Sequence, residues 1–268
     1  MVKVKICGIT NISDAYSAAE CGVDALGFIF YPKSQRYVAP AKAKEMIQKL
    51  PSEIVRVGVF VNHKIHEVKE IAQFCGLNLI QLHGDESPEY CAQFPMSSLI
   101  KAVSCQTEEE IRELRNYPVA AILVDARDKG NYGGTGKNSD WRLAIKVKEM
   151  HPLILAGGLN RENIKEAIER VRPQVVDLNT GVEIYPGKKD PNKISEIMKI
   201  VHETDTPHPN PPPRGRRGRE GVTELFSKYS MGIRGENVTL QSWAQLDRSG
   251  LPSETLKLRI IKERESGG

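Results

Sequence analysis

The chain has 268 residues and a formal net charge of +4. Because eleven Lys/Arg and eight Asp/Glu lie from Asp205 onward, the part before Asp205 is nearly neutral, and we expect nucleic-acid binding at most through the basic tail. The five cysteines contain no CxxC pair; they indicate neither a zinc site nor a disulfide framework and favour a reducing cytoplasm. No apolar stretch is long enough to cross a bilayer, and we expect neither a membrane segment nor a signal peptide.

Short apolar runs recur along the chain at roughly even intervals, and each is rich in Val, Ile, Leu or Phe. Such runs are typical of strands that are buried on both faces, as in a parallel sheet. The runs are Val2–Cys7, Ala25–Phe30, Val55–Phe60, Leu79–His83, Ser98–Val103, Ala121–Asp125, Leu153–Ala156 and Val175–Asn179. Segments with helical periodicity lie between most of them, and we expect Asn160 and Asp190 to cap two of these helices.

Eight strands that alternate with helices predict a (β/α)8 TIM barrel over residues 1–204. A doubly wound open sheet has the same alternation, but the count of eight and the absence of a Gly-rich turn after the first strand favour the closed barrel. Residues 205–221 are rich in Pro, Gly and Arg, so we expect a disordered linker there. Residues 222–268 have too few apolar residues to predict a domain and form a tail of unknown structure.

Cys7 lies two residues after Lys5 in the first predicted strand, so the thiol and the ammonium share one face. A nearby cation favours the thiolate, which is the reactive form. The ordinary alternatives are a packing cysteine and, for Asp125, a turn residue. Because Asp125 ends the sixth predicted strand, both side chains would reach the C-terminal mouth of a barrel, where one can act as base and the other as acid.

Other polar and glycine residues follow the remaining predicted strands, and we expect them to bind a substrate. They are Arg36, His83, Gly157, Gly158, Asp177, Thr180 and Gly181. The glycine turns after the seventh and eighth strands predict a phosphate site, because backbone N–H groups can approach an anion closely there; alternatively, they only make tight turns. The GGTGK segment at 133–137 lacks P-loop spacing, so we expect a loop that covers the ligand, or a plain flexible loop.

Several motifs match a known family in order and in register. They are KICGIT, GFIFYPKSQRYV, VGVFVN, QLHGDE, GGTGK, LAGGL and VDLNTGVE. Over residues 1–201 the chain thereby closely resembles phosphoribosylanthranilate isomerase of tryptophan biosynthesis. Two positions depart from the family pattern: Gln35 stands where Pro is common, and Asn179-Thr180 stands where small hydroxyl residues are common. The resemblance does not extend to the tail.

The resemblance implies an Amadori rearrangement of N-(5-phosphoribosyl)anthranilate. Asp125 would be the general acid that opens the ribose ring, and Cys7, as thiolate, would be the base that removes the C2 proton. Arg36 would pair with the anthranilate carboxylate, and backbone amides around Gly158, Thr180 and Gly181 would hold the phosphate. We expect no metal or organic cofactor, and a monomer or homodimer. The alternative function is a sugar-phosphate-binding barrel that has lost catalysis and acts as a regulator or scaffold.

Overall fold

The computed structural model describes residues 1–104, 107–125 and 141–204. The predicted linker at 205–221, the tail at 222–268 and the GGTGK loop therefore lie outside the described residues. No helix within the described ranges is both long enough and apolar enough to cross a membrane.

The central feature is a closed barrel of parallel strands that follow one another in chain order. Its strands are β1 (Lys3–Ile6), β2 (Ala25–Ile29), β3 (Val55–Phe60), β4 (Leu79–Leu82), β5 (Leu99–Val103), β6 (Ala121–Val124), β7 (Leu153–Leu155) and β8 (Val175–Leu178). Pairing of β1 with β8 closes the ring and sets Lys5 opposite Asp177. The predicted (β/α)8 barrel is confirmed, and the open sheet is excluded.

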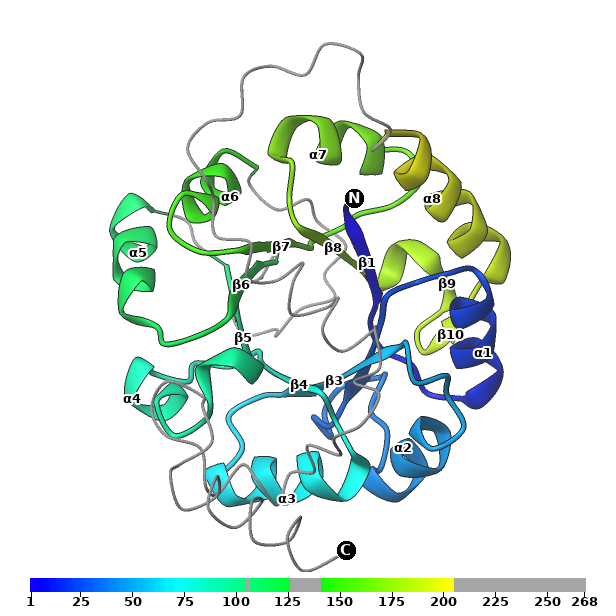
Figure 1. Cartoon of the computed structure of the whole chain (residues 1–268), viewed down its shortest axis with the longest axis horizontal. Helices are drawn as coiled ribbons and strands as arrows, with labels where there is room; N and C mark the ends of the chain where they lie inside the picture. Colours follow the sequence, from blue (N-terminus) through cyan, green and yellow to red (C-terminus); the bar gives the residue numbers. More distant parts are fainter. Residues whose placement is uncertain (105–106, 126–140, 205–268) are drawn as a thin grey trace, which may run out of the picture.

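Helices form an outer ring around the strands (Figure 1). Those in the described residues are α1 (Ile12–Glu20), α2 (Pro40–Ile47), α3 (Ile65–Cys75), α4 (Pro88–Cys91), α5 (Glu108–Glu113), α6 (Trp141–Lys148), α7 (Ile164–Val171) and α8 (Pro191–Thr204). Two short strands, β9 (Glu183–Tyr185) and β10 (Lys188–Lys189), form an antiparallel pair between β8 and α8.

Strand alternation divides the buried side chains into two layers. In β1, Val4 and Ile6 belong to the large core between strands and helices, whereas Lys5 points to the other face, inside the barrel. Gln81 of β4 and Asp177 of β8 lie on this inner face as well. The rest of the interior includes a small apolar cluster made of residues such as Val57, Ile100 and Leu123. The strands are thus apolar on both faces, which explains why they stand out in the sequence as continuous apolar runs.

One of the two predicted helix caps is wrong. Asp190 caps α8, because its Oδ1 accepts from the backbone N–H of Asn192 at 3.0 Å. By contrast, α7 begins at Ile164 with Asn163 as its N-cap, three residues after Asn160. The Asn163 Oδ1 accepts from the backbone N–H of Asn160 at 2.9 Å, so the two amides build a turn that delays the helix.

Candidate active site

Cys7 follows β1 directly and is buried at the end of the barrel to which the parallel strands run. Its backbone N–H donates to the carbonyl of Leu178 at the end of β8, at 2.8 Å. Below it in the interior, Lys5 Nζ lies 2.7 Å from Asp177 Oδ2, and both side chains are buried. The shared face predicted for Cys7 and Lys5 is therefore present, but the ammonium has a carboxylate partner.

Burial raises the pKa of the Cys7 thiol above its ordinary value, and the attraction of Lys5 and Lys189 offsets this rise only in part. Burial also lowers the pKa of Lys5, but Asp177 and Cys7 outweigh burial, so the net shift is upward and Lys5 stays an ammonium. The nearby cation does favour the thiolate, as expected. Its effect on the pKa of Cys7 is smaller, however, than the effect of desolvating the charged sulfur.

Gly27 of β2 makes room for the thiol, a role that sequence analysis missed. A Cβ on Gly27 would lie 2.8 Å from Cys7 Sγ and 3.1 Å from Cys7 Cα. Both distances are shorter than ordinary contacts, so any larger residue at position 27 would displace Cys7. The alternation of Ala25, Gly27 and Ile29 inside the barrel could have identified the close approach, because glycine in a strand interior often marks one.

On the other side of the mouth, His83 Nε2 lies 3.3 Å from Asp125 Oδ2, and both side chains are 13% exposed. Asp125 follows β6 and His83 follows β4. Burial raises the pKa of Asp177; among its neighbours, Lys5 and His83 lower that pKa, whereas Asp125 raises it further. The strand ends therefore bring Cys7, His83 and Asp125 to one mouth of the barrel, with Asp177 beside Lys5 in the layer below, as the barrel rule predicts.

Arg36 does not present an open guanidinium fork. Its Nε and Nη2 donate to the two oxygens of Glu183, at 2.9 and 2.7 Å. Glu183 also accepts from the buried Lys189, whose Nζ lies 2.9 Å from Oε1. Burial alone would raise the pKa of Glu183, but these two cations outweigh it and lower that pKa. Sequence analysis missed Glu183 and Lys189, because the hairpin that carries them follows no strand or helix periodicity.

The glycine turns after β7 and β8 lie against each other. Gly157 and Gly158 have φ values of +85° and +69°, a region that favours glycine. A Cβ on Gly181 would lie 2.0 Å from the carbonyl oxygen of Leu159, so the turn that begins at Thr180 packs directly on the turn after β7. Within the described residues, no acceptor is bonded to the backbone N–H groups of Gly158 and Gly181, which suits the predicted anion site.

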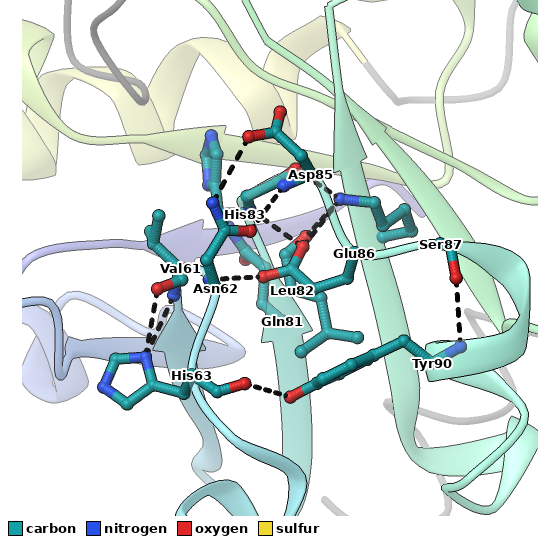
Figure 2. Close-up of polar contacts among 12 residues, drawn as sticks. Val61, Asn62, His63, Gln81, Leu82, His83, Asp85, Glu86, Ser87 and Tyr90 are labelled. Atoms are coloured by element: carbon teal, nitrogen blue, oxygen red, sulfur yellow. Dashed lines mark hydrogen bonds and ion pairs between the residues drawn. The ribbon is translucent and has the colours of Figure 1, made fainter.

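A buried network fixes the loop that follows His83 (Figure 2). Glu86 Oε1 accepts from the backbone N–H of Asn62 at 2.8 Å, and its Oε2 accepts from the backbone N–H of Gly84 at 2.9 Å. Lys101 Nζ completes the network 2.9 Å from Oε2. Glu86 lies in the QLHGDE motif, but its structural role was not predicted; Lys101, a charge within an apolar strand, was the available signal.

Among the described residues no group of His, Cys, Asp and Glu side chains is arranged to hold a metal ion. The chemistry that the mouth can supply is proton transfer: a thiol on one side, a carboxyl on the other, and backbone N–H groups for an anion. The fold and this site together define a (β/α)8-barrel enzyme with acid–base groups at the C-terminal ends of its strands.

Comparisons with known proteins identify the particular family. Residues 4–200 match the family model described as N-(5′-phosphoribosyl)anthranilate (PRA) isomerase. A relative of that name from Syntrophus aciditrophicus is 53% identical over 201 residues, which cover 75% of this chain and 87% of the relative. One from Thermotoga neapolitana is 48% identical, covering 74% of this chain and 98% of the relative.

Solved structures agree with the sequence relatives. Phosphoribosylanthranilate isomerase from Thermotoga maritima is 42% identical, covers 76% of this chain and all of its own, and superimposes with a TM-score of 0.69. A solved structure described as phosphoribosyl anthranilate isomerase in complex with reduced 1-(o-carboxyphenylamino)-1-deoxyribulose 5-phosphate is 39% identical, has a TM-score of 0.66, and covers 76% of this chain and all of its own. The chain belongs to the N-(5′-phosphoribosyl)anthranilate isomerase family, as its motifs predict, and it is an isomerase.

Proposed function

We propose that the chain catalyses the Amadori rearrangement of N-(5-phosphoribosyl)anthranilate to 1-(2-carboxyphenylamino)-1-deoxyribulose 5-phosphate, a step of tryptophan biosynthesis. Family membership supports the reaction. The observation that carries the mechanism is the placement of Cys7 and Asp125 at the ends of β1 and β6, at one mouth of the barrel. An acid and a base there can act on opposite sides of a bound sugar.

Asp125 acts first, as the general acid. Its carboxyl proton goes to the ribose ring oxygen while the bond from C1 to that oxygen breaks. The anthranilate nitrogen supplies the electron pair, so a Schiff base forms at C1 and the ring oxygen becomes a hydroxyl. Asp125 is left as a carboxylate, and His83, 3.3 Å away, is positioned to stabilise it with an N–H group.

Cys7 acts second, as the base. Its thiolate takes the proton from C2, the electrons of that bond form a C1=C2 double bond, and the Schiff-base nitrogen becomes an amine. In the final tautomerisation the C2 hydroxyl loses its proton, C1 gains one, and the ketone forms. Electrons move only within the substrate, so we propose that the reaction needs no cofactor; activity should survive dialysis against a chelator.

Binding groups surround these two residues. We propose that the phosphate is held by the backbone amides of the Gly157–Gly158 and Thr180–Gly181 turns. Arg36 meets the anthranilate carboxylate through Nη1, because Nε and Nη2 are engaged by Glu183. Asp177 supports the site from below by holding Lys5 against Cys7.

Turnover of the purified full chain with N-(5-phosphoribosyl)anthranilate tests this function, together with growth of a tryptophan-requiring strain that lacks the isomerase. We expect turnover and growth. A chain that binds the reduced product analogue but fails both assays would instead be a catalytically silent sugar-phosphate-binding barrel. The Cys7→Ala variant serves as the matched negative control.

We further propose a monomer or homodimer that works in the cytoplasm. A similar structure from Thermotoga maritima is described as derived from a dimeric isomerase, which supports the homodimer, and the cysteine pattern supports a reducing compartment. Light scattering on the purified chain measures its mass directly, and cell fractionation tests the location. A larger assembly or a membrane-bound fraction would contradict this proposal.

A further inference from the structure

Gln81 is a fully buried polar side chain inside the barrel, on β4. Its Nε2 lies 2.9 Å from Nδ1 of His83. An amide nitrogen carries two hydrogens and can only donate, so Nδ1 must be the ring nitrogen that offers a lone pair. A neutral imidazole then holds its one proton on Nε2, the nitrogen that lies 3.3 Å from Asp125 Oδ2.

We propose that Gln81 is a positioning residue that fixes the tautomer of His83 so that an N–H group faces Asp125. The inference rests on the proposed function, in which Asp125 is the general acid. A carbonyl-type oxygen accepts a hydrogen bond better than a hydroxyl oxygen, so a donor at Oδ2 directs the acidic proton to Oδ1. Gln81 thereby determines which carboxyl oxygen delivers the proton to the substrate.

The cost of burying Gln81 supports a functional role. Its Oε1 is buried without a hydrogen-bond partner among the described residues, and an unsatisfied buried acceptor costs about 1–3 kcal/mol. Its neighbours inside the barrel, Leu79 and Ile100, are apolar and fully buried. An apolar side chain would therefore pack there at lower cost, so the bond to His83 is what the amide contributes.

The groups around His83 are acidic, and only one of them lacks a cation. Asp177 is already paired with Lys5, so Asp125, which carries a proton in its proposed role as the acid, is the group that Nε2 faces. If the amide oxygen of Gln81 faced Nδ1 instead, the ring would hold its proton on Nδ1 or carry a positive charge. The two arrangements give different nitrogen signals, so they can be distinguished by experiment.

The test is ¹⁵N NMR of the imidazole nitrogens in the full chain at neutral pH, with His83 assigned by the loss of its signals in His83→Gln. We expect a protonated Nε2 and an unprotonated Nδ1. In Gln81→Met, which keeps the length but lacks the donor, the tautomer preference should weaken, and kcat should fall about tenfold with KM nearly constant, the equivalent of one hydrogen bond.

The control is Gln73→Met, the same change at an exposed position of α3, which should alter neither signal nor kcat. A wild-type His83 that is protonated on Nδ1 or on both nitrogens overturns the proposal, even if Gln81→Met does not fold. A drop in kcat without a change of tautomer also overturns it. Full activity in Asp125→Asn would instead refute the acid assignment, and the tautomer measurement would still decide the role of Gln81.

Discussion

The two sides of the barrel mouth differ in how their polar groups are balanced. On the β8–β1–β2 side the buried cations Lys5 and Lys189 are paired with Asp177 and Glu183, and Arg36 adds a second contact to Glu183. On the β4–β6 side, His83 and Asp125 are partly exposed and rely on the neutral amide of Gln81. The proposed base, Cys7, thus lies among compensated buried charges, whereas the proposed acid, Asp125, is partly exposed at the mouth.

The difference has a chemical reason. In the proposed mechanism Cys7 changes its charge inside a desolvated region, and fixed ion pairs there can offset part of the cost of forming a thiolate. Asp125, the proposed acid, holds a proton and then releases it, and a permanent positive charge beside it would favour the carboxylate too strongly. An N–H group of a neutral imidazole, as we propose for His83, would stabilise the carboxylate without that penalty. The following substitutions test each side of this comparison.

The largest effect is expected at Cys7. Cys7→Ala should lower turnover by about 10²–10⁴-fold, the usual contribution of a general base, while folding and binding of inorganic phosphate stay intact. Turnover, thermal unfolding and phosphate affinity are measured on the same samples. Turnover close to that of the wild type would remove Cys7 as the base.

The pH dependence of the wild type sharpens this prediction. Burial raises the pKa of Cys7, so the reactive thiolate is the minor form at neutral pH and increases as pH rises. The ultraviolet absorbance of the thiolate, taken as the difference between the wild type and Cys7→Ala, should therefore grow as the pH rises into the alkaline range. A difference that is already complete at neutral pH would contradict a raised pKa for Cys7.

Asp125→Asn tests the opposite side of the mouth. The amide keeps the shape of the carboxyl group but cannot donate a proton in the same way, so kcat should fall by about 10²–10³-fold with KM little changed. Steady-state kinetics at several substrate concentrations separate the two parameters. If only KM rises, Asp125 binds the substrate and the acid is another group.

Arg36→Met tests the binding part of the charged side. A charge-assisted bond contributes about 1.5–3 kcal/mol, so affinity for anthranilate-bearing ligands should fall by roughly 10–100-fold. Affinity for ribose 5-phosphate should change much less. Because Arg36 also contacts Glu183, Glu183→Gln is the matched control for disturbance of the pair; an equal loss for both ligands in Arg36→Met would place Arg36 at the phosphate.

Gly27→Ala tests the packing around the base. The added methyl would lie 2.8 Å from Cys7 Sγ, and displacement of the sulfur by tenths of an ångström should lower kcat about tenfold. Overpacking should also cost about 1–3 kcal/mol of stability. In the Cys7→Ala background the same change should cause no further loss of turnover, since the two act through one atom. Additive losses would show that Gly27 acts independently.

Much of the fold was predictable because buried parallel strands are short continuous apolar runs. Predicted and observed strand ends agree within one residue, for example Val55–Phe60 for β3 and Leu99–Val103 for β5. The barrel rule then predicted the positions of Cys7, His83 and Asp125 at one mouth. The start of α7 could not be predicted in this way, because Asn160 and Asn163 compete as caps and only the tertiary turn decides between them.

The partners of the site residues were harder to predict. Glu183 is 147 positions from Arg36 in the chain, and neither residue shows a periodicity that would pair them. The balance of burial and charge at Cys7 also depends on packing. The sequence predicts that Lys5 lies on the same face as Cys7, but it does not predict how deeply the two side chains are buried. Local sequence patterns therefore predict which strand ends carry the functional groups. The structure is needed to determine how burial and neighbouring charges shift the pKa values of these groups.

The smallest effect is expected from removing the C-terminal segment. The barrel closes through the pairing of β1 with β8, and α8 buries Ile194, Ile197, Met198 and Val201 before it ends at Thr204. A chain that ends after Thr206 should therefore keep its melting temperature within a few degrees and retain full isomerase activity. Thermal unfolding and turnover of the shortened and full chains, measured side by side, decide the matter. A large loss in either would mean that residues 207–268 stabilise the barrel, and the domain boundary proposed from composition would be wrong while the assignments on both sides of the mouth remain.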